Sequence, residues 1–213
     1  MNYAIEILPA LLNGAVMTLK VFFFTLLGSI PLGILISFAL QTRFKPLQWI
    51  INLYIWLMRG TPLLLQLIFV FYGLPLMGIV FERYDAALFA FILNYAAYFA
   101  EIFRGGIQSI PEGQYEAAKV LRLTKGQTVV RIILPQVIKI VLPSIGNEVI
   151  NLVKDTSLIY VLGLGDLLRA GKIAMSRDVS LIPLLLVGLI YLLLTAFLTL
   201  LSKKLEKHYQ YYK

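Results

Sequence analysis

Residues 114 to 136 read QYEAAKVLRLTKGQTVVRIILPQ, a polar and charged stretch within a chain that is otherwise strongly apolar. The sequence of 213 residues is 60% hydrophobic and only 14% charged, and its mean hydropathy is +0.84. A soluble domain of this length carries more charge, so several segments must lie in lipid. The quoted stretch is therefore expected to leave the membrane as a loop between two buried segments.

Three long windows contain no acidic or basic residue, and each covers the roughly 20 residues that a membrane-spanning helix needs. They are Val21 to Thr42, Gly60 to Phe81 and Val179 to Leu201. Two further apolar segments carry polar residues, and together these five predict an all-α integral membrane protein with a single transmembrane domain over residues 1–213. The expected spans cover about residues 11–40, 47–76, 86–103, 132–153 and 181–201, with the loop at about 104–131. Met1 to Pro9 has no basic residue, so the first segment is expected to remain as a span and not to be a signal peptide.

The net charge of +8 is attributed to membrane topology, because the basic residues gather in the connections between spans. Twelve fall on one side of the predicted membrane and five on the other. Under the positive-inside rule this places the N-terminus outside, and the loop and the C-terminal tail in the cytoplasm. The twelve are Arg43, Lys45, Arg104, Lys119, Arg122, Lys125, Arg131, Lys139, Lys203, Lys204, Lys207 and Lys213; the five are Arg83, Lys154, Arg169, Lys172 and Arg177. Basic surface here indicates lipid headgroups, and no nucleic-acid partner is expected.

The fourth expected span carries a polar stripe. At about 100° per residue, Ser144, Asn151 and Asp155 all fall within about 60° of Glu148, and the stripe is about 17 Å long. Carboxylates at membrane depth cost about 2.5 to 3.5 kcal/mol each unless they face protein or water. The stripe therefore predicts the wall of a substrate pathway suited to an ammonium or guanidinium group.

The alternative is that Glu148 and Asp155 form ion pairs with Lys139, Lys154 or a basic residue of a neighbouring span and only hold helices together. Helical geometry is expected to end near Asp155-Thr156-Ser157, where side-chain capping could start a new segment and expose backbone groups to a ligand. The predicted substrate-binding residues are Ser144, Glu148, Asn151, Asp155, Thr156 and Ser157.

A second candidate feature interrupts the second span at Arg59, Gly60, Thr61 and Pro62. The glycine and the proline predict a kink or a broken helix. The break is either part of a gate or ligand site, or a place where Arg59 snorkels or pairs with a carboxylate such as Glu148, Asp155 or Glu101.

Three further features of the third span indicate packing. Glu101 and Arg104 are expected to form a local ion pair, and Asn94 an interhelical hydrogen bond. Small side chains along the same span indicate close helix packing. They are Ala86, Ala90, Ala96, Ala97 and Ala100.

The loop itself predicts two short helices. Ser109 to Glu112 and Thr124 to Gln127 each fit a capping box, so helices are expected to begin at both places. Glu116, flanked by Ala117 and Ala118, forms a compact knob that can enter a groove on a partner protein. The alternative is a solvated amphipathic loop without a partner.

Several ordered motifs resemble the permease subunits of polar amino acid ABC importers, in the histidine and glutamine permease family, over nearly the whole chain. They are Arg59-Gly60-Thr61-Pro62 with Gln66, the run from Ala100 to Ile107, Pro111-Glu112-Gly113-Gln114 with Glu116-Ala117-Ala118, Leu134-Pro135-Gln136, and Lys154-Asp155-Thr156-Ser157-Leu158. The resemblance implies a five-helix type I importer fold whose cytoplasmic "EAA" loop docks on an ATPase. The implied coupling residues are Gly113, Glu116, Ala117, Ala118 and Arg122, although the family usually has glycine where this chain has Arg122.

The resemblance also implies the partners. They are a second permease subunit, identical or paralogous, a cytoplasmic ATPase dimer that binds ATP and magnesium, an extracellular amino-acid-binding protein, and an amino acid substrate, expected to be basic or polar. No phosphate-binding GxxxxGK[ST] loop occurs in this chain, since Gly163-Leu164-Gly165-Asp166 lacks the lysine and the spacing. The chain is therefore expected to bind no cofactor or metal and to catalyse no reaction. The alternative function is an ion-coupled secondary amino acid transporter or channel.

Overall fold

The computed structural model describes residues 2–209 and contains only helices and their connections over that range. Two π-helices (η1, η3) and two 3-10 helices (η2, η4) interrupt the α-helices. In chain order the elements are α1 (Asn2–Ala39), α2 (Lys45–Gly60), α3 (Leu63–Ile68), η1 (Phe69–Gly73), η2 (Leu74–Met77), α4 (Arg83–Gln108), α5 (Glu112–Val120), α6 (Lys125–Thr128), η3 (Val129–Ile133), α7 (Leu134–Asp155), η4 (Thr156–Leu162), α8 (Leu167–Asp178) and α9 (Ile182–Tyr209). The all-helical prediction is confirmed.

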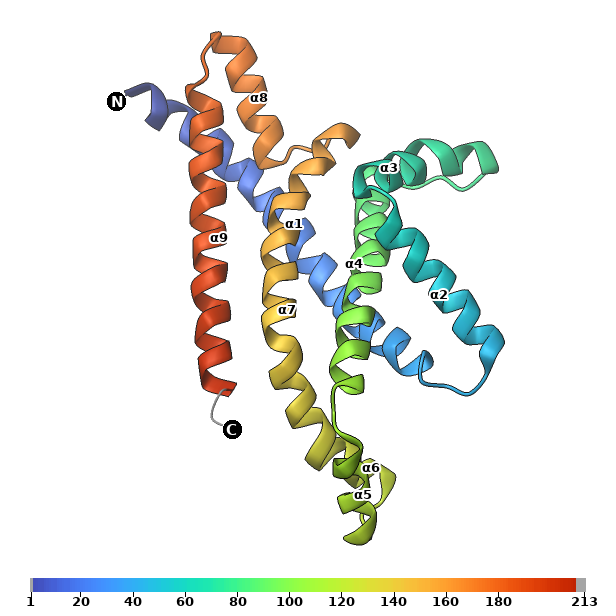
Figure 1. Cartoon of the computed structure of the whole chain (residues 1–213). Coiled ribbons are helices and arrows are strands. Elements are labelled where there is room, and N and C mark those ends of the chain that lie inside the picture. The colour runs from blue at the N-terminus through green and yellow to red at the C-terminus, as the bar shows by residue number, and fades with distance from the viewer. Residues whose placement is uncertain (1, 210–213) are drawn as a thin grey trace.

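Four helical segments in the described residues are long and apolar enough to cross a membrane, and the number is five if α2 and the segment after it count as one bent span. The second span bends by 106° at the break after Gly60, which confirms the kink or broken helix predicted there. The first helix starts near the N-terminus, about nine residues before the predicted boundary. Its 38 residues extend about 57 Å, more than the ~30 Å hydrocarbon layer, so α1 must cross at a strong tilt. Figure 1 shows it running diagonally across the other helices.

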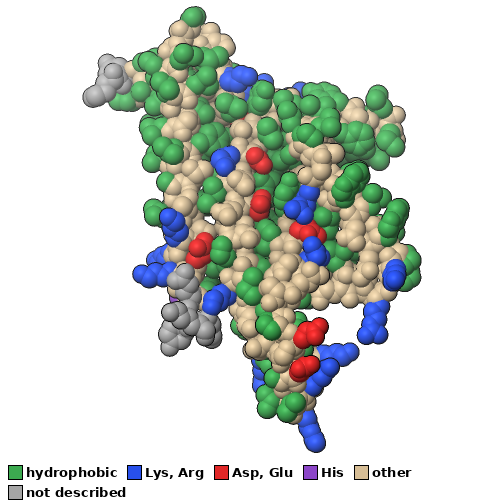
Figure 2. All heavy atoms as spheres, in the orientation of Figure 1, with side chains coloured by type: hydrophobic (Ala, Val, Ile, Leu, Met, Phe, Trp, Pro, Cys, Tyr) green, Lys and Arg blue, Asp and Glu red, His purple; other side chains and the backbone are tan. Residues whose placement is uncertain are grey.

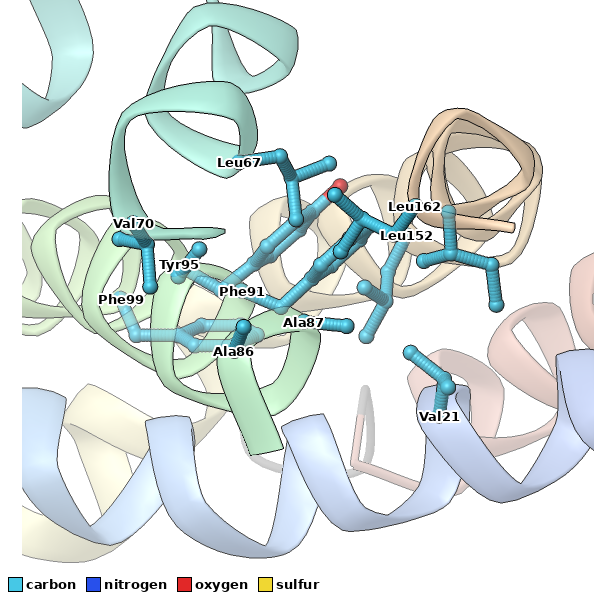
Figure 3. Packing of buried hydrophobic residues seen from close by; sticks show 12 residues of the cluster. Val21, Leu67, Val70, Ala86, Ala87, Phe91, Tyr95, Phe99, Leu152 and Leu162 are labelled. Atoms are coloured by element: carbon cyan, nitrogen blue, oxygen red, sulfur yellow. The ribbon is translucent and has the colours of Figure 1, made fainter. Parts of the chain in front are cut away.

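The alanine-rich span α4 lies at the centre of the bundle. Its small residues Ala86, Ala90, Ala96, Ala97 and Ala100 are at most 2% exposed, which confirms the predicted close packing. Glycines of α1 complete the contact, since a Cβ on Gly33 would lie 2.7 Å from the Cβ of Phe99. Figure 3 shows how Phe91, Tyr95 and Phe99 fill the space between helices. The core cluster joins α1, the segment after the break, α4, α7 and η4 through Val21, Leu67, Val70, Phe91, Leu152 and Leu162.

A helix that the sequence did not reveal, α8, packs against α1 and α9. Its N-cap is Asp166, whose carboxylate accepts hydrogen bonds from the backbone N–H of Leu168 at 3.0 Å and of Arg169 at 3.3 Å. Burial raises the pKa of this fully enclosed carboxyl to about 6, although the two backbone hydrogen bonds oppose the rise. An aspartate before an apolar run is an N-cap signal, and it is the feature of the sequence that indicates α8.

The contact between α1 and α8 predicts a sharp difference between two glycines. A Cβ on Gly14 would lie 2.8 Å from the backbone oxygen of Asp166, whereas Gly188 in α9 has nothing within 4 Å. We expect Gly14→Ala to lower the free energy of unfolding by about 1–3 kcal/mol, because backbone cannot move aside as a side chain can. Gly188→Ala, the matched control, should be neutral or stabilising by about 0.5–1 kcal/mol. Thermal unfolding of both variants in detergent checks this, and equal melting temperatures would contradict it.

The two ends of the bundle differ. The N-terminal end of α1 and the helix α8 lie at one end, and the short helices α5 and α6 lie at the other (Figure 1). The C-terminal half of α9 points toward the end that holds α5 and α6. Lys213, one of the basic residues counted in the tail, lies outside the described residues.

Candidate translocation cavity and coupling loop

A cavity of about 660 Å³ lies where α4, α7 and the broken second span meet. Its lining is mixed in character, with charged, amide and phenol groups beside leucines. The residues are Arg59, Gly60, Thr61, Pro62, Leu63, Leu64, Asn94, Tyr95, Tyr98, Glu148, Asn151, Asp155 and Leu158. The whole predicted helix break and half of the predicted substrate residues therefore line one cavity.

The polar stripe of α7 divides between two environments. Glu148, Asn151 and Asp155 line the cavity. Ser144 is exposed and lies outside the lining. Thr156 is fully buried and its hydroxyl donates to the backbone oxygen of Val153, while Ser157 lines a separate pocket with Lys154 against α8 and α9.

The α-helix ends at Asp155, as predicted, but the cap does not form as predicted. The chain continues directly into the 3-10 helix η4, and the Asp155 side chain caps no backbone N–H. The 3-10 geometry turns Thr156 and Ser157 away from the cavity. Both residues therefore face other elements, and only Leu158 of this segment reaches the lining.

The carboxylate of Asp155 accepts a hydrogen bond of 2.7 Å from the hydroxyl of Tyr95 on α4. Within residues 2–209, neither Glu148 nor Asp155 has a basic side chain within the 4.0 Å of an ion pair. Lys154, one of the expected partners, forms no ion pair with either carboxylate among the described residues. Two carboxylates face the cavity without a neutralising partner at ion-pair distance.

Arg59 pairs with Glu101 at 3.5 Å, one of the carboxylates that the sequence offered it. Glu101 is held more tightly by Arg104, through two hydrogen bonds of 2.9 and 2.6 Å, which confirms the predicted local pair. The Arg59 guanidinium also lies 5.3 Å from the centre of the Tyr98 ring. Figure 2 shows charged side chains of both signs gathered in the middle of this face of the molecule.

The helix break is stabilised by side-chain amides. Pro62 has no N–H, so the backbone oxygen of Met58 loses its normal helical partner. The amides of Gln66 and Asn94 both donate to that oxygen, at 2.9 Å each. The Asn94 amide also donates to the Gln66 carbonyl at 3.0 Å, so the predicted interhelical hydrogen bond is confirmed and the break is held open against α4.

Sequence reasoning missed the aromatic part of the lining. Tyr95 and Tyr98 lie one turn apart on α4, and both reach the cavity. A tyrosine hydroxyl in a predicted span needs a polar partner, as Asn94 does. The tyrosines of the third predicted span were therefore the feature of the sequence that could have indicated this part of the lining.

The loop folds as the two short helices α5 and α6 that the sequence predicted. The capping box from Thr124 to Gln127 is confirmed, with both of its reciprocal hydrogen bonds. The box expected at Ser109 is wrong: the Ser109 hydroxyl donates to the backbone oxygen of Gly106, and Pro111 begins α5 without a side-chain cap. Gly113, Glu116 and Ala117 are exposed, and Ala118 is buried.

The backbone conformation of Arg122 explains why the family usually has a glycine at this position. Its φ is 53°, in the left-handed region. The N–H of Arg122 donates to Lys119 O and the N–H of Leu123 to Ala118 O, the two bonds of a Schellman motif that ends α5. Glycine adopts this conformation without cost, and other residues pay about 1–2 kcal/mol.

We therefore expect a defined order among Arg122 variants. Arg122→Gly should increase hydrogen-exchange protection of the amides at positions 122 and 123, because it removes the strain of a side chain at positive φ. Arg122→Val should reduce protection by about tenfold, because a β-branched residue tolerates this region least. Hydrogen exchange measured by mass spectrometry on the loop peptide checks the order. Equal protection in the valine variant would contradict the assigned conformation.

Residues 29–211 match the family described as the binding-protein-dependent transport system inner membrane component. The chain belongs to this family. The permease is 39% identical over 202 residues to the arginine transport system permease protein ArtQ of Bacillus subtilis (strain 168), covering 94% of this chain and 92% of the relative. It is 40% identical over 203 residues to the probable glutamine ABC transporter permease protein GlnM of the same organism, covering 93% and 94%.

Solved structures agree with this assignment. The permease superposes with a TM-score of 0.90 on a chain of an amino acid ABC transporter crystallised with histidines, at 33% identity and with 97% of each chain covered. The MetNI methionine ABC transporter in an inward-facing conformation matches with a TM-score of 0.74 at 17% identity, covering 98% of this chain and 99% of the other, which is a likeness of fold. The protein is an amino acid ABC transporter permease with the type I importer fold.

Proposed function

We propose that this permease forms half of the translocation pathway of an ATP-driven importer for basic or polar amino acids, in a bacterial inner membrane. The observation that carries the proposal is the cavity in which Glu148, Asn151 and Asp155 meet the helix break. Two carboxylates without a basic partner at ion-pair distance favour a substrate with a cationic side chain or amino group. The similarity to an arginine transport permease supports this choice of substrate.

The cavity wall also presents a cationic group, on Arg59, and the neutral amides of Asn94 and Asn151. The guanidinium of Arg59 lines the same cavity and shares Glu101 with Arg104, so it can turn toward the carboxylate of an amino acid. The amides of Asn94 and Asn151 offer donors and acceptors between the charged groups. An amino acid carries both charges, which fits a wall that presents both.

The loop transmits force in this proposal. Exposed Glu116 and Ala117 on α5 dock on a cytoplasmic ATPase dimer, which binds ATP and magnesium, while this chain binds neither. The segment from α6 to η4 is one nearly continuous helical path from the loop to Asp155. Movement of the loop is passed along it to the cavity wall, which opens to each side in turn. The N-terminus lies outside and the loop inside, as the distribution of basic residues favours.

A reconstitution experiment tests the function. The permease, purified alone and with its partner ATPase, is placed in liposomes that contain ATP, and uptake of labelled arginine is measured with an amino-acid-binding protein outside. We expect uptake only with the ATPase and only with hydrolysable ATP. Uptake by the permease alone, driven by an ion gradient, would refute the proposal and support a secondary transporter.

A further inference from the structure

Two arginines converge at the end of the molecule opposite α5 and α6, beside the turn that links η4 to α8. A Cβ built on Gly163 would lie 3.0 Å from Arg83 Nη1 and 3.1 Å from Arg169 Nη1. Gly163 has a φ of 76°, a conformation that favours glycine, and its missing side chain leaves the space between the two guanidinium groups open. Arg83 begins α4 and Arg169 lies in the first turn of α8.

Neither arginine has an acidic side chain at ion-pair distance within the described residues. The ion pairs found within residues 2–209 involve Arg59, Arg104 and Arg177, and neither Arg83 nor Arg169. Asp166 is close in sequence, but it is buried and its oxygens accept the backbone hydrogen bonds that cap α8. Converging guanidinium groups repel one another unless an anion lies between them, and their forked donors match a carboxylate or a phosphate.

A third cation lies near the pair. Lys172 follows Arg169 by one helical turn, and its Nζ lies 4.5 Å from the centre of the Tyr160 ring on η4. The Lys172 side chain is exposed, so its charge adds to the positive potential of this surface.

The position of the pair links it to the cavity. Asp155 and Leu158 line the cavity, and η4 runs from Thr156 to Leu162, immediately before Gly163. The other arginine begins α4, the helix that carries Tyr95 and Tyr98. An anion held between Arg83 and Arg169 would therefore connect α4, which lines the cavity through Tyr95 and Tyr98, to α8 beside the end of η4.

We propose that Arg83 and Arg169 form a docking site for acidic side chains of the extracellular binding protein. This inference rests on the proposed function, and on the orientation that places this end outside. A protein carboxylate is favoured over a lipid phosphate because the pair lies at the end of η4, five residues along the chain from Leu158 of the cavity lining, near where a delivered amino acid must enter. Membership of a binding-protein-dependent family supplies the partner, and the proposed orientation places that partner on this side. An anionic lipid headgroup has similar chemistry and is an outcome of the test.

The experiment uses the complete complex of permease and ATPase in nanodiscs, with the amino-acid-binding protein that stimulates ATP hydrolysis by the wild type. Arg83→Gln and Arg169→Gln should each raise the concentration of binding protein at half-maximal stimulation by about tenfold, and the double variant by more, because each loses a charge-assisted contact. The wild-type half-maximal concentration should rise steeply with salt, and the double variant should lose most of that dependence. Hydrolysis without binding protein should be unchanged, which shows that the variants are folded.

Arg177→Gln is the matched control, because Arg177 is another arginine of α8, exposed but paired with Asp178 at 2.7 Å. It should leave the half-maximal concentration unchanged. An unchanged concentration in the double variant overturns the inference, and so does an effect that appears only in nanodiscs with anionic lipid, which assigns the pair to lipid. If no binding protein stimulates the wild type, the proposed function itself fails, and this outcome is distinct from the other two.

Discussion

Glu148→Gln is expected to lower arginine uptake by the reconstituted complex about 10- to 100-fold while changing glutamine uptake by no more than about threefold. The substituted glutamine side chain has nearly the same size as the glutamate side chain and can still form hydrogen bonds, so the substitution removes only the negative charge. A hydrogen bond between charged groups contributes about 1.5–3 kcal/mol, which corresponds to that range. The comparison of kcat/KM for the two substrates checks the prediction.

Two further variants separate substrate recognition from structure. Asp155→Asn should show the same preference but a larger loss of stability, because the carboxylate of Asp155 also accepts the Tyr95 hydroxyl at 2.7 Å. Asn147→Ala, one residue before Glu148 and outside the cavity lining, should leave both activities within about twofold of the wild type. An equal loss of arginine and glutamine uptake in Glu148→Gln would show that the carboxylate only supports the fold.

The sequence predicted those parts of the fold that depend on local composition. Long apolar runs indicate membrane-spanning helices. A capping box such as Thr124 to Gln127 depends on only four consecutive residues. The stripe on α7 was also local, because helical periodicity places Glu148, Asn151 and Asp155 on one side whatever the rest of the chain does.

The remaining features depend on contacts between distant segments. Gly60 and Pro62 predict the break, but its angle of 106° depends on how Gln66 and Asn94 hold the backbone oxygen of Met58, and Asn94 comes from another helix. Helical periodicity could not place Thr156 and Ser157, since the chain changes to 3-10 geometry after Asp155. The convergence of Arg83 and Arg169, 86 positions apart, could be recognised only once the turn at Gly163 was known.

Glu116→Arg is expected to abolish most amino acid uptake while the complex still binds substrate. Glu116 is exposed on α5, and its neighbour Ala117 leaves the helix surface flat enough to enter a groove. A longer side chain of opposite charge prevents that fit and repels any cationic partner group. We expect uptake to fall at least about 50-fold, ATP hydrolysis to lose its response to the binding protein, and arginine affinity, measured by calorimetry on the purified permease, to stay within about twofold.

Gln114→Arg is the control that distinguishes docking from a general effect of charge. Gln114 is exposed on the same helix but lies about 160° away from Glu116 around its axis. An arginine there places the same long cationic side chain on the opposite face, with a net charge change of +1 where Glu116→Arg gives +2. Uptake should fall by less than about threefold. Normal uptake in Glu116→Arg would mean that α5 does not carry the force. If both variants lost uptake equally, added positive charge alone would account for the effect. Glu116 would then not be the contact from which movement passes through α6 and α7 to Glu148 and Asp155.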